Sequence, residues 1–227
     1  MSVPSTALAP ATHAEYLERN VIPRSGLSSA NHHEVPRAVV LAGQPGAGKR
    51  KINDAAKIEL GYDVVPIDPD DLRDTHPDVE RLRQQHPYTW AGHTHEDASQ
   101  WAKELRSAAI DGRRNLILDT TLGNGDSAVA LIKDLQANGY EVEIRGVVAH
   151  RLESELGVDG RFSDSLDTKG LGCYVPLTVV LDGWTALEMR PILSKGNAAR
   201  SAPTVAFRKP PDPSLEAQRE ARRLASA

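Results

Sequence analysis

The feature that most constrains the fold is a glycine-rich loop between a short apolar run and a stretch with helical spacing. Residues 38–42 are apolar and include two adjacent valines, which predicts a buried strand. The loop at 43–50 reads Gly-Gln-Pro-Gly-Ala-Gly-Lys-Arg, and its spacing matches GxxxxGK. In such a loop, glycines let backbone N–H groups point at phosphate oxygens, and the following helix adds its positive dipole end. We therefore interpret these residues as a phosphate-binding loop.

A plain glycine-rich turn is the alternative interpretation, but the strand before the loop and the helix after it favour phosphate binding. Lys49 is expected to neutralise phosphate charge. The motif normally continues with a Ser or Thr that holds Mg²⁺, whereas this chain has Arg50. Arginine cannot ligate a cation, and its charge repels one. The residues expected to bind nucleotide are Gly43, Gln44, Pro45, Gly46, Ala47, Gly48, Lys49 and Arg50.

Composition excludes several classes of protein. The 227 residues suit one α/β domain of ordinary size, and no apolar run approaches the ~20 residues of a membrane span. Residues 1–20 lack the apolar core of a signal peptide. The single cysteine, Cys173, rules out an intrachain disulfide, and the net charge of −4 does not favour nucleic acid. We expect a cytoplasmic protein that binds neither membranes nor nucleic acid.

The remaining patterns alternate between strand and helix. This alternation predicts an α/β fold of the P-loop NTPase type, with a parallel sheet flanked by helices. The main domain is expected at 37–208, after an irregular or helical flank at 1–36 and before a charged C-terminal helix or tail at 209–227. Strands are expected at 38–42, 63–67, 115–118, 141–149 and 204–207, and helices at 13–22, 48–60, 95–110, 126–138, 150–165, 176–193 and 214–227.

Polar side chains follow two of the expected strands, at their carboxyl ends. Ligands of open α/β sheets bind at this edge, so two such strands beside a phosphate loop indicate a site. Capping of the next helix is the alternative role for Asp70, and for Asp71 a cap or solvent position is preferred. These residues are Asp68, Asp70 and Asp71 after one strand, and Asp119, Thr120 and Thr121 after the other.

The segment at 75–95 is polar and rich in histidine, and we expect it to be solvated and to face the substrate. His93 and His95 have the spacing of a metal-binding pair. No further ligand type stands at a recognisable distance from them, so no metal site is assigned.

Two charged residues on expected helices are also candidates. Glu104 lies off the apolar stripe of its helix and could face a cleft, although an exposed glutamate is the commoner case. Arg161 could clamp phosphate through its planar guanidinium, and a surface arginine is the alternative.

Taken together, these pieces resemble the zeta toxin family of bacterial toxin–antitoxin systems. The loop at 43–49 is similar to the family's GQPG(A/S)GK. Residues 67–77 resemble its I-D-x-D motif followed by a basic residue and His-Pro, and residues 115–121 resemble a strand motif usually ending Glu-Gly-Thr. Residues 138–140 and 156–161 also fit, and the resemblance covers about 34–176.

The resemblance implies a kinase. Members phosphorylate the 3′-hydroxyl of the sugar in UDP-N-acetylglucosamine with ATP or GTP and Mg²⁺, and the loss of this precursor poisons cell-wall synthesis. A relative among plant-pathogen effectors phosphorylates NAD instead. The family's antitoxins are small helical proteins, so a helical antitoxin partner is expected.

Carried over by position, the family's roles fall on residues already singled out. Asp70 matches the general base, and Lys49 and Arg161 match the phosphate clamps. The positions that match substrate contacts are Asp119, Thr120, Thr121 and Glu104.

This chain departs from the family pattern at three positions. Arg50 replaces the Mg²⁺-binding hydroxyl, Cys173 stands where a second catalytic arginine is usual, and Asp119 is one methylene shorter than the usual glutamate. Loss of such an arginine can lower the rate on the order of 10³-fold. Two interpretations therefore stay open: a kinase acting on a nucleotide-sugar or dinucleotide, and a weakened relative that binds nucleotide or a partner. An ordinary small-molecule or nucleoside kinase fits the Gln-Pro loop less well.

Overall fold

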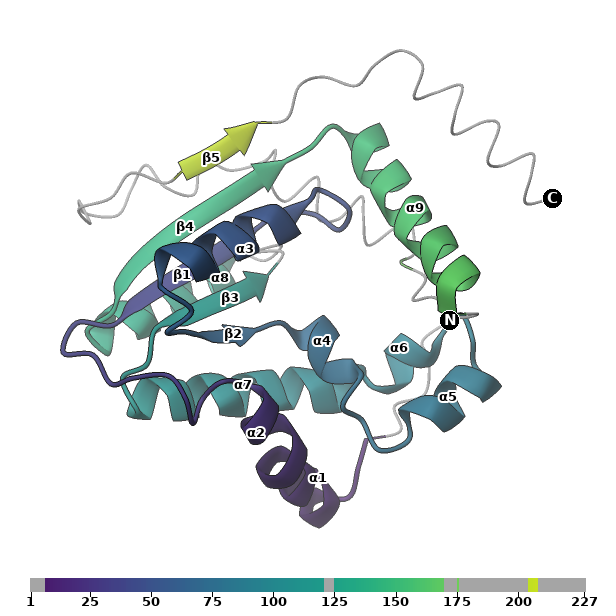
Figure 1. Cartoon of the computed structure of the whole chain (residues 1–227), viewed down its shortest axis with the longest axis horizontal. Helices are drawn as coiled ribbons and strands as arrows, with labels where there is room; N and C mark the ends of the chain where they lie inside the picture. Colours follow the sequence, from purple (N-terminus) through teal and green to yellow (C-terminus); the bar gives the residue numbers. More distant parts are fainter. Residues whose placement is uncertain (1–6, 121–124, 170–174, 176–203, 208–227) are drawn as a thin grey trace.

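The strands form one parallel sheet. The computed structural model describes residues 7–120, 125–169, 175 and 204–207 (Figure 1). Its five-stranded sheet has the order β2-β3-β1-β4-β5, and every neighbouring pair in it is parallel. This confirms the expected fold class and each expected strand. The strands are β1 Arg37–Ala42, β2 Val65–Ile67, β3 Leu116–Thr120, β4 Glu141–Val148 and β5 Thr204–Phe207.

Helices connect and flank these strands. The expected helices near residues 13, 48, 95, 126 and 150 are present, with bounds that differ by a few residues. Those expected at 176–193 and 214–227 lie outside the described residues. The helices are α1 Pro10–Tyr16, the π-helix η1 Leu17–Val21, α2 Ile22–Arg24, α3 Lys49–Glu59, α4 Pro69–Arg73, α5 Val79–Gln85, α6 Trp90–His93, α7 His95–Asp111, α8 Gly125–Ala137 and α9 Arg151–Lys169.

Alternation along β1 divides the core between the two faces of the sheet, because successive side chains of a strand point to opposite faces. Val40 packs with Trp101 and Leu105 of α7, in a cluster that also includes Leu135 of α8. Val39 packs with Ala56 of α3 in a separate cluster. Figure 1 accordingly shows α3 on one face of the sheet, with α7 and α8 on the other.

The segment at 75–95 corrects the expectation of a solvated stretch. It contains α5 and α6, whose buried side chains form a small cluster of their own: Val79, Leu82, Trp90 and Ala91. His76 and His93 are also buried. These helices have only 7 and 4 residues, which is too short for a periodic pattern to stand out.

The N-terminal segment belongs to the main core. Val21 and Ala30 are buried there, and Leu8, Tyr16 and Leu17 pack against the same cluster. The boundary at residue 36 remains a prediction. Among the described helices, none is both long enough and apolar enough to cross a membrane.

Candidate active site

The loop after β1 has the backbone shape that its glycines suggest. Gly46 and Gly48 have φ angles of 79° and 93°, a region that residues with a Cβ rarely adopt. Gln44 is fully buried, and its Nε2 donates to the carbonyl oxygen of Ala149 over 2.8 Å. The loop is therefore tied to the end of β4 before α3 begins at Lys49.

Helix α9 runs directly against the backbone of the loop. A Cβ on Gly157 would lie 2.6 Å from the carbonyl oxygen of Gly46, and a Cβ on Gly46 would lie 2.1 Å from that of Ser154. Arg161 follows Gly157 by one helical turn and has an exposed side chain. Since residues four apart share a helix face, Arg161 continues the face of α9 that meets the loop.

Lys49 and Asp119 meet where β1 and β3 end. The register aligns Leu41 with Asp119 and Ala42 with Thr120, so the end of β3 lies beside the start of the loop. The Nζ of Lys49 is 2.7 Å from Oδ1 of Asp119 and donates to the carbonyl oxygen of Thr120 over 3.2 Å. Thr121, the third predicted residue of this group, lies outside the described residues.

At the end of β2, the helix cap is Asp68. Its Oδ1 accepts a hydrogen bond from the backbone N–H of Asp70 over 2.9 Å. Asp70 and Asp71 lie in the first turn of α4, so neither of them is the cap. Asp71 is exposed, as the solvent position preferred for it implies. Capping by Asp68 leaves the carboxylate of Asp70 available, and its side chain is 77% exposed.

Asp70 is ion-paired with Arg73, which makes further polar contacts. Its Oδ1 is 3.0 Å from Nε of Arg73, and Arg73 also donates to Nδ1 of His95 over 3.2 Å and to the carbonyl oxygen of Ala91. Burial, and after it the charge of Arg73, lower the pKa of His95. This ring is therefore a neutral acceptor near pH 7.

His93 and His95, which have the spacing of a metal-binding pair, contact different residues. His93 is buried and stacks on His86 with ring centroids 4.3 Å apart. His95 contacts Arg73. In the described part of the chain, no group of three or more His, Cys, Asp or Glu residues could hold a metal ion.

Asp68 lies at the same edge of the sheet, and the sequence patterns predict no individual function for it. Burial, and after it the negative charge of Asp119, raise the pKa of Asp68 to about 7. Burial also raises the pKa of Asp71. The sequence feature that could have identified Asp68 is its position directly after β2. A residue there can cap the next helix and also lie at the edge of the sheet where ligands bind.

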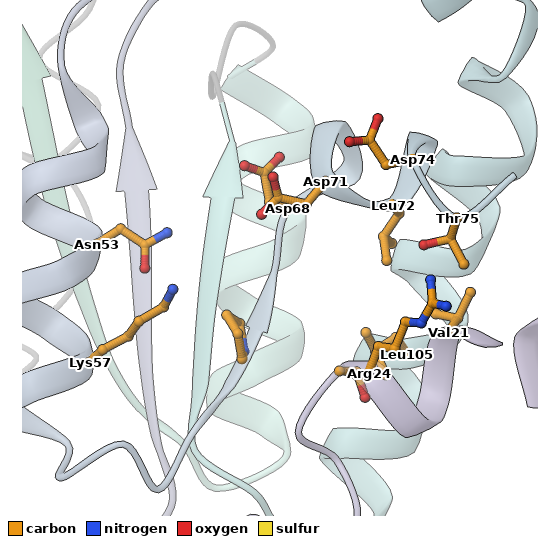
Figure 2. A pocket seen from close by; sticks show the side chains of 12 residues that line it. Val21, Arg24, Asn53, Lys57, Asp68, Asp71, Leu72, Asp74, Thr75 and Leu105 are labelled. Atoms are coloured by element: carbon orange, nitrogen blue, oxygen red, sulfur yellow. The ribbon is translucent and has the colours of Figure 1, made fainter. Parts of the chain in front are cut away.

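A pocket lies beside the edge strand β2, lined by residues of α3, α4, α7 and the N-terminal segment. It has a volume of about 290 Å³. Figure 2 shows Asn53 and Lys57 extending from α3 on the side that faces β2, with Asp68 and Asp71 across from them. Arg24 of the N-terminal segment also lines it.

Glu104 is joined to a different part of the molecule. Its Oε2 is 3.2 Å from Nε2 of His13 on α1, and its Oε1 accepts a hydrogen bond from Gln100 over 2.9 Å. These contacts connect α7 to the N-terminal segment and not to the loop. The substrate contact suggested for Glu104 remains a prediction.

The described residues do not fit the Mg²⁺ site that the resemblance implies. Arg50 stands where a hydroxyl ligand would be, and the carboxylate of Asp119 is already engaged by Lys49. Cys173 lies outside the described residues. We therefore assign Mg²⁺ no role in the chemistry discussed below.

Comparison with known proteins decides the family. The sequence model of the zeta toxin family matches residues 25–190, most of the chain. The chain belongs to the zeta toxin family. It is 28% identical over 129 residues to the zeta toxin of Enterococcus hirae, covering 57% of this chain and 45% of that protein. It is 30% identical over 128 residues to toxin PezT of Streptococcus pneumoniae serotype 4, covering 56% and 50%. The chain thus spans about half the length of these relatives.

Two solved structures share the fold of this chain. The structure of the PezAT toxin–antitoxin system of Streptococcus pneumoniae superposes with a TM-score of 0.66 at 24% identity, covering 80% of this chain and 73% of that one. The AvrRxo1-ORF1:AvrRxo1-ORF2 complex with sulphate ions superposes with a TM-score of 0.58 at 19% identity, covering 82% and 63%. At these identities the likeness supports the P-loop kinase-like fold alone.

Proposed function

We propose that this zeta toxin family member is a phosphotransferase that binds ATP or GTP in the loop at 43–50. The observation that carries the proposal is the convergence of Lys49 and Asp119 at the loop, with Asp70 at the neighbouring strand end. The loop and the N-terminus of α3 would hold the phosphates through backbone N–H groups. Lys49 and Arg161 would neutralise the charge of the transferred group.

The acceptor in this proposal is a sugar hydroxyl of a nucleotide-sugar such as UDP-N-acetylglucosamine. Asp70 would accept the hydroxyl proton as that oxygen attacks the γ-phosphorus, while the bond to the leaving nucleotide oxygen breaks. The contact with Arg73 keeps the carboxylate of Asp70 oriented. Asp119, Thr120, Thr121 and Glu104 are the proposed acceptor contacts. Both substrates would be met in the cytoplasm, and a helical antitoxin is the proposed protein partner.

Arg50 supports a second candidate, a nucleotide-binding protein with little or no transfer activity. The residue after Lys49 carries no hydroxyl, whereas the usual motif has a Ser or Thr hydroxyl there that binds Mg²⁺. A dinucleotide acceptor such as NAD is a third outcome, since the resemblance to the zeta toxin family includes a plant-pathogen effector that phosphorylates NAD.

One experiment separates these candidates. The purified protein is incubated with ATP and either UDP-N-acetylglucosamine or NAD, with and without Mg²⁺, and mass spectrometry detects an added phosphate. Asp70→Asn should remove transfer while nucleotide binding stays unchanged. Asp111→Asn, an exposed carboxylate at the end of α7, is the control. Transfer that persists in Asp70→Asn would exclude Asp70 as the base, and nucleotide binding without transfer in the wild-type protein would favour the second candidate.

A further inference from the structure

Arg50 lies at the edge of the phosphate loop on the side of α4. It follows Lys49, the first residue of α3, whose N-cap is Gly48. Arg50, Asn53 and Lys57 are spaced three and four residues apart, so they share one face of α3. Figure 2 shows Asn53 and Lys57 on the side of α3 that faces Asp68 and Asp71. Arg50 therefore begins a polar stripe that runs from the phosphate loop along the β2 and α4 side.

Lys49 and Arg50, adjacent cations at the start of α3, are held differently. Lys49 is 15% exposed and bound to Asp119 and Thr120. Arg50 is exposed. Among the residues that the structure describes, none forms a hydrogen bond or ion pair with its side chain. Its charge lowers the pKa of Asp71, against the larger raising effect of burial. The guanidinium is thus free to close on a ligand at the loop.

A guanidinium suits this position chemically if the ligand is a phosphate without a metal ion. It presents a planar fork of donors that matches two phosphate oxygens, and it is more weakly hydrated than an ammonium group. A divalent cation at the same place would lose its hydroxyl ligand and meet a positive charge. The engagement of Asp119 by Lys49 removes a further carboxylate from its reach.

We propose that Arg50 takes the place of the divalent cation, so that the loop selects free nucleoside di- and triphosphates over their magnesium complexes. This inference rests on the nucleotide binding proposed above and specifies which form of the nucleotide binds. Lys49 and the backbone N–H groups would hold one side of the terminal phosphates, and Arg50 the side toward α4. The ligand class is an uncomplexed polyphosphate nucleotide.

Equilibrium binding of ATP and ADP tests the proposal, by calorimetry in EDTA and in excess MgCl₂. Wild-type protein should bind in EDTA, and excess MgCl₂ should weaken that binding. Arg50→Thr should weaken binding in EDTA by about tenfold or more, the effect of losing charge-assisted hydrogen bonds, and should make affinity rise with Mg²⁺. Lys51→Thr, an equal charge change on the next exposed residue, should keep the wild-type pattern.

Three results would overturn the proposal. They are wild-type binding that MgCl₂ strengthens or leaves unchanged, equal affinities of Arg50→Thr and Lys51→Thr, and an effect of Arg50→Thr on acceptor binding alone. The outcome is separable from that of the proposed function. Binding in EDTA that MgCl₂ weakens, without any transfer, would support this inference and contradict the proposed kinase activity. Mg²⁺-dependent binding with transfer would do the reverse. The absence of nucleotide binding in both buffers would overturn both.

Discussion

The position of Asp68 at the end of β2 determines both its capping role and its pKa. It caps α4 through Oδ1, and it lies near Asp119, whose charge helps to raise the pKa of Asp68. Lys49 compensates the charge of Asp119. Asp68 and Asp119 therefore lie near each other at this edge, but of these two only Asp119 has a cation in contact.

Asp68→Asn should change the pH dependence of stability. The pKa of Asp68 rises from 3.8 to about 7 on folding, so the folded state holds a proton that the unfolded state releases between these values. The free energy of unfolding contributed by this group therefore falls as the pH rises through that window. A shift of about three units corresponds to ~4 kcal/mol, which partial exposure of the carboxyl reduces to about 2.

Asparagine keeps the capping oxygen but carries no charge. We expect Asp68→Asn to raise the free energy of unfolding by about 2 kcal/mol near pH 8 and to change it little near pH 4. Urea unfolding at both pH values measures this. Asp54→Asn, which is exposed on α3, serves as the control with an effect within about 0.5 kcal/mol at either pH. An equal effect of Asp68→Asn at both pH values would contradict the assignment.

At the scale of elements, the loop and α9 act as one unit. The two backbones approach so closely that Gly46 and Gly157 have no room for a side chain. Gln44 adds a buried hydrogen bond from the loop to the end of β4. Gly46, which shapes the loop, therefore also sets how closely α9, the helix of Arg161, approaches it.

Gly157→Ala tests this contact because two effects oppose each other. Alanine in a helix gains up to about 1 kcal/mol over glycine. The new Cβ would lie 2.6 Å from the carbonyl oxygen of Gly46, and overpacking of this kind costs about 1–3 kcal/mol. We expect the steric effect to dominate, giving a net loss of about 1 kcal/mol in unfolding free energy and weaker nucleotide binding.

Thermal and urea unfolding, together with ATP calorimetry, measure both effects. Ser163→Ala, which is exposed on the same helix, should leave stability and affinity near the wild-type values. A Gly157→Ala protein as stable as the wild type would show that α9 can move away from the loop without loss.

At the scale of the whole molecule, the N-terminal segment is joined to α7 across more than eighty residues of sequence. The buried carboxylate of Asp97 accepts a hydrogen bond from the backbone N–H of Leu8 over 3.0 Å and lies 2.6 Å from Nδ1 of His13. His13 stacks on Trp101 with ring centroids 5.1 Å apart. These contacts add a polar anchor to the apolar packing of residues 8–30.

His13→Ala should destabilise the whole fold. It leaves the carboxylate of Asp97 buried with fewer partners and removes the stacking on Trp101. Breaking a largely buried pair of this kind costs about 2–4 kcal/mol. Urea unfolding measures the loss, and Glu15→Ala on the exposed side of the same helix should cost less than about 0.5 kcal/mol. A His13→Ala protein that unfolds at the wild-type urea concentration would show that the N-terminal segment contributes little to stability.

The sequence alone determined the order of the strands along the chain, the parallel sheet, the family and the loop. Each of these rests on local patterns: a run of β-branched residues, a glycine spacing, or a periodic apolar stripe. It also placed Lys49, Asp70 and Asp119 at the strand ends, since all parallel strands present their carboxyl ends at one edge.

Only the tertiary structure decided which of these residues meet. The pairing of Lys49 with Asp119 depends on β3 lying next to β1, and the partnership of Glu104 with His13 depends on α1 docking on α7. The helices α5 and α6 are too short to leave a periodic pattern. Residues 1–36 were expected to be a flank of the main domain, but several of their apolar side chains pack in its core. These outcomes follow from contacts between residues far apart in sequence, which no local spacing encodes.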